Sequence, residues 1–365
     1  MPSYVDLHAE HFPLSKLTPA HLSPIGLMPN TEHPPVMVAQ ANFIEGGLLL
    51  SIGVHHSASD ASAVGAILEI WAQNTTAAND SRNLHFTKFE AQCRDRSTLM
   101  EGSAGAKLAD FPAYFLQPAI STAPATVQSP QIPSTPVRLP PMTSHIFRFS
   151  PESLAALKVD AAAYSTNDAL TAFLWRHMTL ARNPTSQLKP SIDVEEESSA
   201  VLYAVNIRSR TSPPLRQNYL GNAFLPVKTD RLSISTLTSP SGLKIATSAI
   251  RNPLHQLAEE PNRISLNIGL LGQFTTAELK YAYNGFLGPD IRATSWADLG
   301  IYNSVWGNLG TVKSFRVPGE GSDGSVAMFP RLTDGGLEVM VGLEAGAMGR
   351  LIGNRDFQAK AELWA

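Results

Sequence analysis

The sequence predicts an α/β protein in which strands and helices interleave through both halves of the chain. Short apolar runs with β-branched residues predict buried strands, and apolar residues spaced three and four apart predict helices with one buried face. Of the 365 residues, 43% are hydrophobic and 16% are charged, which excludes a chain that is disordered throughout. The length suits two ordinary domains or one unusually large domain.

The first half contains a predicted strand followed directly by a predicted helix. Residues 48–54 form a short apolar run that ends in a β-branched residue, which is typical of a buried strand. The period of the pattern changes at Ser59, and either Ser59 or Asp60 can cap the helix that follows. One face of this helix is apolar and carries Val64, Ile67, Leu68 and Trp71.

The second half begins with two predicted helices. Ser150 as the cap and Pro151 at the first helical position open one of them. A longer helix is expected over residues 165–181. Leu170, Phe173, Leu174 and His177 lie on one side of it, and this position favours a core role for His177 over a catalytic one.

Strands are expected after these helices. Val201, Tyr203, Val205 and Ile207 alternate with other residues, as in a half-buried strand. Asp334-Gly335-Gly336 separates the apolar segments 326–332 and 337–343, which predicts a hairpin.

Proline marks the predicted domain boundary. Residues 117–142 are crowded with Pro, Ser and Thr, and proline favours an extended connector because it removes backbone donors and restricts its neighbour. We therefore expect an N-terminal domain over residues 1–116, a linker over 117–143 and a C-terminal domain over 144–365. Residues 183–199 are expected to form a solvated loop.

Composition excludes several classes of protein. The net charge of -3 gives no basic surface for nucleic acid. The single cysteine, Cys93, excludes an internal disulfide framework and is expected to be inert. The N-terminus has no signal-peptide pattern, and residues 48–54 fall far short of the ~20 apolar residues of a membrane helix. We expect a cytoplasmic protein with no membrane partner.

One short segment carries recognisable chemistry. There is no G-x-S-x-G, Walker A or G-x-G-x-x-G motif, but His55 and His56 stand where the predicted strand passes into the helix. A histidine there can project into a cleft and act as a general base, and Asp60 can brace the turn as a cap or by pairing with an arginine. Two other interpretations remain open, a satisfied strand-end histidine and a metal site. The second is disfavoured because adjacent strand residues point to opposite faces, so no metal is expected.

Four blocks of the sequence, in order, resemble the CoA-dependent acyltransferases of the BAHD type, and most closely their fungal branch, which includes the trichothecene O-acetyltransferases. The first is the H-x-x-x-D segment from His56 to Asp60. The second, residues 165–175, resembles the S-x-N-D-x-L-x-A-x-x-W helix of the family. The third comprises residues 206–210, 213–215 and 219–222, and the fourth comprises residues 294–296 with Trp306-Gly307. The resemblance runs from about Pro35 to Asp356.

The resemblance implies a fold of two chloramphenicol-acetyltransferase-like sandwich domains joined by the proline-rich crossover, with a solvent channel between them and His56 midway along it. Fewer residues precede His56 than is usual in the family. We therefore expect a shortened N-terminus and an incomplete first domain.

The resemblance also implies roles for individual residues. His56 is the general base, Thr294 and Trp296 lie at the oxyanion, and Asp60 pairs with Arg208. Asn222 orients the loop around Asn303, which is the nearest polar substitute for the aspartate of the D-F-G-W-G motif; aligned without gaps, that aspartate falls on Val305. The residues expected to bind CoA are Ser295, Trp306 and Gly307.

The implied activity is acyl-CoA-dependent O-acylation, with acetyl transfer to a hydroxyl group of a fungal secondary metabolite. Acyl-CoA is a co-substrate, no cofactor is bound, and the protein is a monomer. N-acylation is chemically equivalent at this level. One alternative is a truncated relative that binds a metabolite or a partner without turnover. The other is a condensation-like domain, which is disfavoured because Ala61 stands where those domains have glycine.

Overall fold

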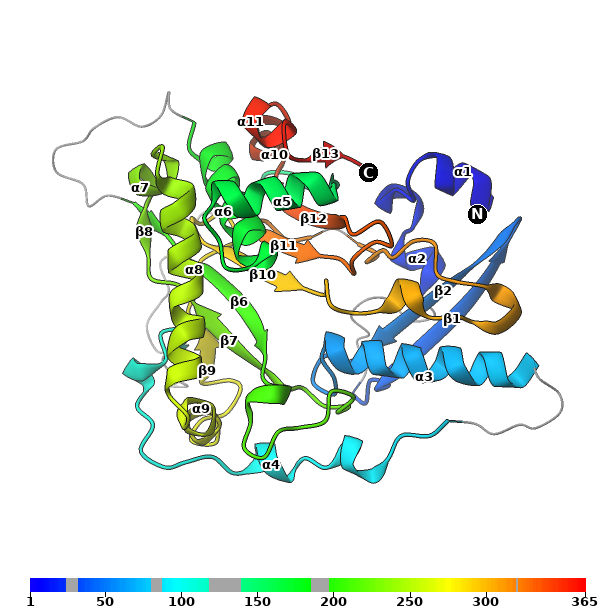
Figure 1. Ribbon diagram of the computed structural model, residues 1–365, viewed down its shortest axis with the longest axis horizontal. Helices are drawn as coiled ribbons and strands as arrows, with labels where there is room; N and C mark the ends of the chain where they lie inside the picture. Colours follow the sequence, from blue (N-terminus) through cyan, green and yellow to red (C-terminus); the bar gives the residue numbers. More distant parts are fainter. Residues whose placement is uncertain (24–31, 80–86, 118–138, 185–196, 320) are drawn as a thin grey trace, which may run out of the picture.

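The computed structural model describes residues 1–23, 32–79, 87–117, 139–184, 197–319 and 321–365. Two unequal halves lie side by side (Figure 1). The smaller is built on the hairpin of β1 (Met37–Ile44) and β2 (Gly47–Val54) with helix α3 (Ala61–Asn79), and the larger on a seven-stranded sheet. Most of the predicted linker, residues 118–138, and most of the predicted loop, residues 185–196, fall outside the described residues. The proposed domain boundary therefore stays a prediction.

The smaller half confirms the predicted strand and helix. Residues 48–54 lie within β2, which pairs antiparallel with β1 along its whole length. α3 begins directly after Asp60. On the other side, α1 (Tyr4–Ala9) and α2 (Pro19–Leu22) help to form a small core. Its members are Leu7, Phe12, Leu17 and Leu22, with Tyr4, Ile44 and Leu49 packed against them.

α3 is less buried than its apolar sequence suggests. Only Ala63 and Ala72 are fully buried, and the predicted apolar face from Val64 to Trp71 is half-buried. In β1 the exposed side chains are on one face, where Phe43 is 81% exposed. A two-stranded sheet is marginally stable by itself, so the smaller half depends on contacts with the larger half.

The large sheet is mixed and has the strand order β13-β4-β12-β11-β10-β6-β7. β10 runs parallel to both β11 and β6, and the other pairs are antiparallel. Its strands are β4 (Met142–Phe149), β6 (Val201–Asn206), β7 (Phe224–Lys228), β10 (Ile291–Ser295), β11 (Ser325–Met328), β12 (Leu337–Glu344) and β13 (Glu362–Leu363). Two short pairs lie outside it: β3 (Tyr114–Leu116) with β9 (Leu279–Tyr281), and β5 (Ser198–Ser199) with β8 (Leu232–Ser233).

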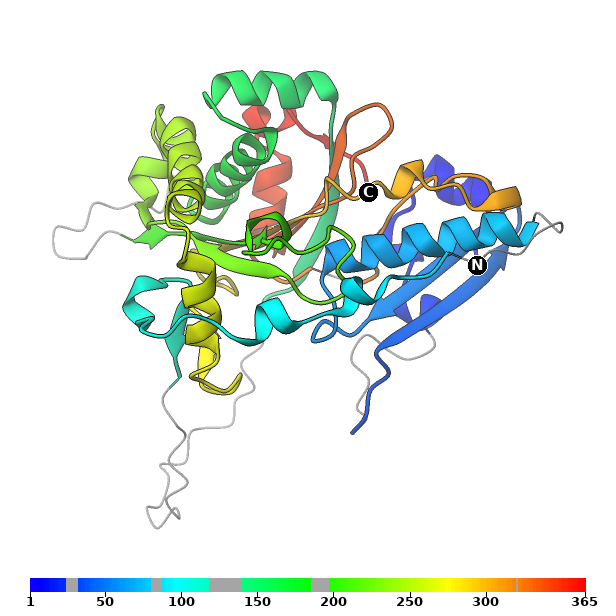
Figure 2. The same cartoon turned by 60° about the horizontal axis from the view of Figure 1, so that its bottom comes forward.

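Helices cover one face of this sheet and form the main core (Figure 2). Trp175 of α6, which is completely buried, lies at its centre and donates a hydrogen bond from Nε1 to Ser199 Oγ. The helices of this half are α5 (Pro151–Asp160), α6 (Thr166–Arg182), α7 (Ile234–Thr238), α8 (Gly242–Glu259), α9 (Arg263–Leu271), α10 (Ala345–Ile352) and α11 (Arg355–Gln358). Before them, α4 (Ser97–Met100) lies in the segment that leads to β3.

The local predictions for this half are confirmed. Ser150 caps α5 with Pro151 at its first position, and Ser165 forms a capping box with Asp168 at the start of α6. β11 and β12 form the predicted hairpin, with Gly335 at φ 91° in its turn. The predicted strand from Val201 ends one residue early, since Ile207 already precedes a 3-10 turn.

The N-terminal segment is held against the second face of the large sheet. Arg316 donates to the backbone carbonyls of His11 and Phe12 and forms a buried bidentate ion pair with Glu338 of β12. The ring of His11 stacks on Trp364 at 3.7 Å. Within the described residues, no helix combines the length and apolar character needed to cross a membrane.

Candidate active site

The candidate site is the turn between β2 and α3, residues 55–60, where the two halves meet. His55 continues the strand pairing by donating its backbone N–H to the Val36 carbonyl, and Ala58 N–H donates to the His55 carbonyl. Asp60 then caps α3, because its Oδ1 accepts the backbone N–H of Ala63 at 2.9 Å. Strand pairing on one side and the helix cap on the other fix the turn.

Asp60 also pairs with Arg208 of the larger half. Arg208 Nη1 lies 2.8 Å from Asp60 Oδ2, and Nη2 lies 2.7 Å from Oδ1, which is bidentate geometry. The two residues are buried, at 1% and 8% exposure. A buried carboxylate needs this degree of neutralisation and hydrogen bonding to persist in the folded protein.

The same two residues attach residues 219–223 of the larger half to the turn. Arg208 Nη2 donates to the carbonyls of Tyr219 and Gly221, and Asp60 Oδ2 accepts the backbone N–H of Ala223 at 2.8 Å. Ser59 Oγ adds a 2.6 Å hydrogen bond to the Leu220 carbonyl. The position of the turn is therefore set by the larger half.

His56 lies at the open side of this junction. Its carbonyl accepts a hydrogen bond from Asn222 Nδ2 at 2.8 Å, and its ring centroid lies 6.1 Å from that of Phe224 at the start of β7. The residue is exposed, so solvent reaches the imidazole directly. The channel expected to run past His56 stays a prediction.

His55 is held differently from its neighbour. Its Nδ1 accepts the backbone N–H of Ser57 at 3.3 Å and lies 2.7 Å from Ser57 Oγ. His55 is thus occupied within the turn, whereas no hydrogen bond to the His56 ring occurs among the described residues. The metal alternative for His55, His56 and Asp60 has no support, because Arg208 and two backbone N–H groups already occupy both oxygens of Asp60.

Thr294, Ser295 and Trp296 lie at the carboxyl end of β10. Thr294 is half-buried and Ser295 is exposed. The indole of Trp296 packs in an aromatic cluster, at 5.7 Å from Phe315 and 6.3 Å from Phe329. No hydrogen bond joins these three residues to His56 in the part of the chain that the structure describes, so their oxyanion and CoA roles stay predictions.

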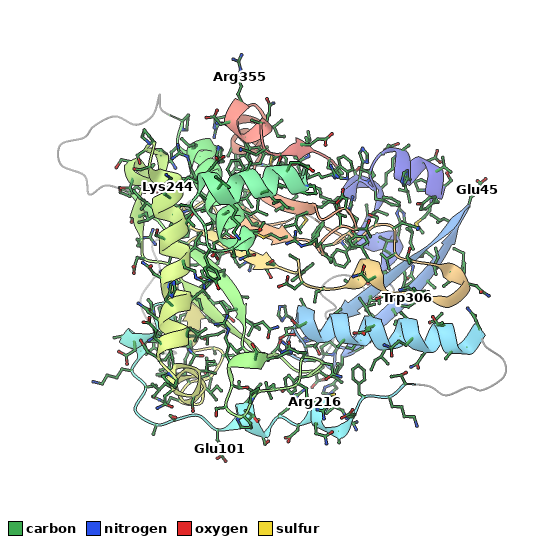
Figure 3. The ribbon with its side chains drawn as sticks, viewed as in Figure 1. Glu45, Glu101, Arg216, Lys244, Trp306 and Arg355 are labelled. Carbon is green, nitrogen blue, oxygen red and sulfur yellow. The ribbon has the colours of Figure 1, made fainter. Side chains whose placement is uncertain are left out.

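The loop after Trp296 runs along α3 and ties the halves together a second time. Trp306, labelled in Figure 3, lies beside α3 with its ring 5.9 Å from Trp71. Thr76 Oγ1 donates to the Val305 carbonyl and accepts the backbone N–H of Gly307, both at 2.9 Å. Gly307 has φ 57°, and a Cβ there would lie 2.1 Å from Asn79 Nδ2.

This geometry bears on the residues expected to bind CoA. Trp306 is only 9% exposed, and its Nε1 has no hydrogen-bond partner among the described residues. Its side chain packs between the halves, which leaves little of it available to a ligand. Asn303 is exposed, and the amide of Asn222 donates to the His56 carbonyl. No hydrogen bond joins the two asparagines in the described part of the chain, so the expected role of Asn222 at this loop stays a prediction.

Two contributors to the site were not foreseen from the sequence. Thr76 fixes the loop that contains Val305 and Gly307, and Phe224 lies against the imidazole. Thr76 is one of two consecutive threonines near the end of a helix, a pattern with no chemical signature. Phe224 lies at the start of a strand, two positions after the block that ends at Asn222, and this position is the signal that could have found it.

Comparison with known proteins gives consistent matches. The Transferase family model matches residues 14–357. Acyltransferase easC of Emericella nidulans is 30% identical over 99% of this chain and 76% of its own length. Eremophilane O-acetyltransferase prx11 of Penicillium rubens is 31% identical over 97% of this chain and 77% of its own.

Solved structures match the fold along the whole chain. TRI101 of F. graminearum, in complex with coenzyme A and deoxynivalenol, superposes with a TM-score of 0.81 at 18% identity, covering 100% of this chain and 79% of its own. Vinorine synthase superposes with a TM-score of 0.59 at 17% identity, covering 96% and 72%. These matches support the predicted α/β fold of two chloramphenicol-acetyltransferase-like halves.

Proposed function

We infer the reaction of this chain from its family: it belongs to the Transferase family of BAHD-type acyltransferases and to its fungal branch. We propose that it transfers an acetyl group from acetyl-CoA to a hydroxyl group of a fungal secondary metabolite. His56 is the general base of this proposal. That the protein is an acyltransferase follows from its family, and the donor, the acceptor and the base are what we propose.

The observation that carries the proposal is the contrast between the two adjacent imidazoles. His56 is exposed, its ring has no hydrogen bond among the described residues, and its backbone is held by Asn222. His55 is engaged by Ser57. A base must be reachable by the proton that it removes and must be held in position. Both histidines are exposed, but of the two only His56 keeps both ring nitrogens free of hydrogen bonds to the described residues while its backbone is held by Asn222.

In the proposed reaction, His56 accepts the proton of the acceptor hydroxyl as its oxygen attacks the thioester carbonyl. The new C–O bond forms as the carbonyl electrons move to oxygen, giving a tetrahedral oxyanion. The C–S bond then breaks, the CoA thiolate leaves, and the proton passes from His56 to that sulfur. A positioned base of this kind contributes about 10²–10⁴ in rate.

The test is transfer of label from radiolabelled acetyl-CoA by the purified protein, with a metabolite extract of the producing fungus as the acceptor pool. We expect labelled ester from the wild type and a ~10²–10⁴-fold lower rate from His56→Ala. His55→Ala is the matched control and should keep most of the activity. Equal loss in both variants, with both folded, would contradict the assignment of the base.

The same assay also tests whether this member of the family has lost turnover and only binds a metabolite. Loss of turnover predicts no labelled product from the wild type, together with metabolite binding that His56→Ala leaves intact. If the labelled product is an amide instead of an ester, the protein is still an acyltransferase, but its acceptor is an amine.

A further inference from the structure

A cavity of about 200 Å³ lies at the end of α6. It is lined by His177, Leu180, Ala181, Asn183, Pro184, Arg350 and Asn354. These residues come from the last two turns of α6 and the two positions after it, from the last turn of α10 and from the N-cap of α11. The cavity has room for roughly six or seven waters at about 30 Å³ each, which is the size of a small organic acid.

His177 presents an unpartnered nitrogen at this cavity. The residue is 6% exposed, and its Nδ1 lies 2.9 Å from the Phe173 carbonyl, so Nδ1 carries the hydrogen. Nε2 has no hydrogen-bond partner among the described residues. Burial lowers the pKa of His177 to about 4, so the imidazole is neutral near pH 7 and Nε2 is a hydrogen-bond acceptor.

Arg350 supplies the opposite chemistry. Its Nε is occupied by the Ala181 carbonyl, but its two terminal nitrogens have no ion pair or hydrogen bond within the described residues. Glu344, whose charge acts on Arg350, uses its two oxygens to cap α10 through Gly346 and Ala347. The two terminal nitrogens of the guanidinium are therefore free to bind a carboxylate through two parallel hydrogen bonds.

We propose that this cavity binds a small carboxylic acid that carries a hydroxyl or ammonium group on the carbon next to the carboxylate. The carboxylate accepts from Arg350, and the neighbouring hydroxyl or ammonium donates to His177 Nε2. Asn354 lines the same cavity. Its Oδ1 caps α11 by accepting the backbone N–H of Phe357, so its amide N–H₂ remains as a further donor.

The cavity is separate from the candidate active site. α6, α10 and α11 lie together on the helical face of the large sheet, away from the start of α3 where His56 lies (Figures 1 and 2). Binding here is therefore independent of the proposed acetyl transfer, and His56→Ala should leave it unchanged.

Isothermal titration of the full chain with lactate, alanine and propionate tests the proposal. Lactate or alanine should bind with one-to-one stoichiometry at millimolar concentration. Propionate, which has the carboxylate but no donor beside it, should bind at least ~10-fold more weakly. Which of lactate and alanine binds more tightly distinguishes a hydroxy acid from an amino acid.

Two variants connect the binding to these side chains. Arg350→Met should weaken it by ~10-fold or more, whereas Arg355→Met, on the outward-pointing arginine labelled in Figure 3, should not change it. Ligand should also shift the Nε2 resonance of His177, identified by its absence from His177→Gln. Absence of wild-type binding to all three acids, equal binding of propionate, or undiminished binding by Arg350→Met would overturn the proposal.

Discussion

Replacement of Arg208 by methionine tests how the His56 turn is held. The substitution removes both donors of the bidentate pair and leaves the Asp60 carboxylate buried, with only the backbone N–H groups of Ala63 and Ala223. Removing one partner of a buried ion pair costs about 3–5 kcal/mol. The carbonyls of Tyr219 and Gly221 lose a donor as well, at about 1 kcal/mol each.

We therefore expect Arg208→Met to lower the free energy of unfolding by about 5–7 kcal/mol, a large part of the ~5–15 kcal/mol of an ordinary domain. Urea unfolding followed by circular dichroism measures it. Arg210→Met is the matched control, because Arg210 is exposed and has no ion pair in the described part of the chain; it should change stability by less than about 0.5 kcal/mol.

The double variant Asp60→Leu with Arg208→Met separates two costs: that of a buried carboxylate without its ion-pair partner, and that of a general loss of packing. Because it removes the buried carboxylate as well, it should be more stable than Arg208→Met alone. The reasoning is refuted if Arg208→Met behaves like Arg210→Met, or if removing Asp60 in addition makes the protein still less stable.

Three further results are expected. Thr76→Val removes the hydroxyl that joins α3 to the loop and should cost about 1–2 kcal/mol in urea unfolding, whereas Thr75→Val, which loses only a bond within α3, should cost clearly less; equal losses would show that the bridge is unimportant. Asn222→Ala should lower kcat by up to ~10²-fold with little change in KM for acetyl-CoA, in steady-state kinetics, because it frees the backbone of His56; a change confined to KM would contradict this. Burial lowers the pKa of His177 from 6.5 to about 4. As the pH falls from 6.5 to 4, this histidine takes up a proton in the unfolded chain but not in the folded protein, so the free energy of unfolding should fall by about 3 kcal/mol. His177→Gln should lack this part of the pH dependence of unfolding, and identical pH profiles of the variant and the wild type would exclude this contribution of His177.

Local signals in the sequence predicted individual elements well. The cap at Ser150 followed by Pro151, the capping box of Ser165 and the turn glycine at Gly335 each depend on neighbouring residues only, and each appears in the structure. Such features are readable because the backbone groups that they satisfy lie within four residues.

Contacts across the two halves were much harder to predict. The role of Thr76 depends on carbonyl and N–H groups more than 200 positions away, and nothing in the residues around Thr76 indicates them. The packing of Trp306 against Trp71 likewise depends on a loop that lies along α3 and comes from far away in the sequence, and the expected role of Trp306 in CoA binding stays a prediction. The pairing of Asp60 with Arg208 also spans a long separation, 148 positions. It could be predicted only because the family resemblance implied it.

The ties between residues 55–60 and 206–223 limit how chimeric acyltransferases can be assembled from this chain. A crossover inside the proline-rich linker would separate Asp60 and Ser59 from the arginine and the peptide carbonyls that fix their geometry. Recombinants made to broaden acceptor range should therefore inherit both stretches from one parent, whatever the origin of the remaining sequence.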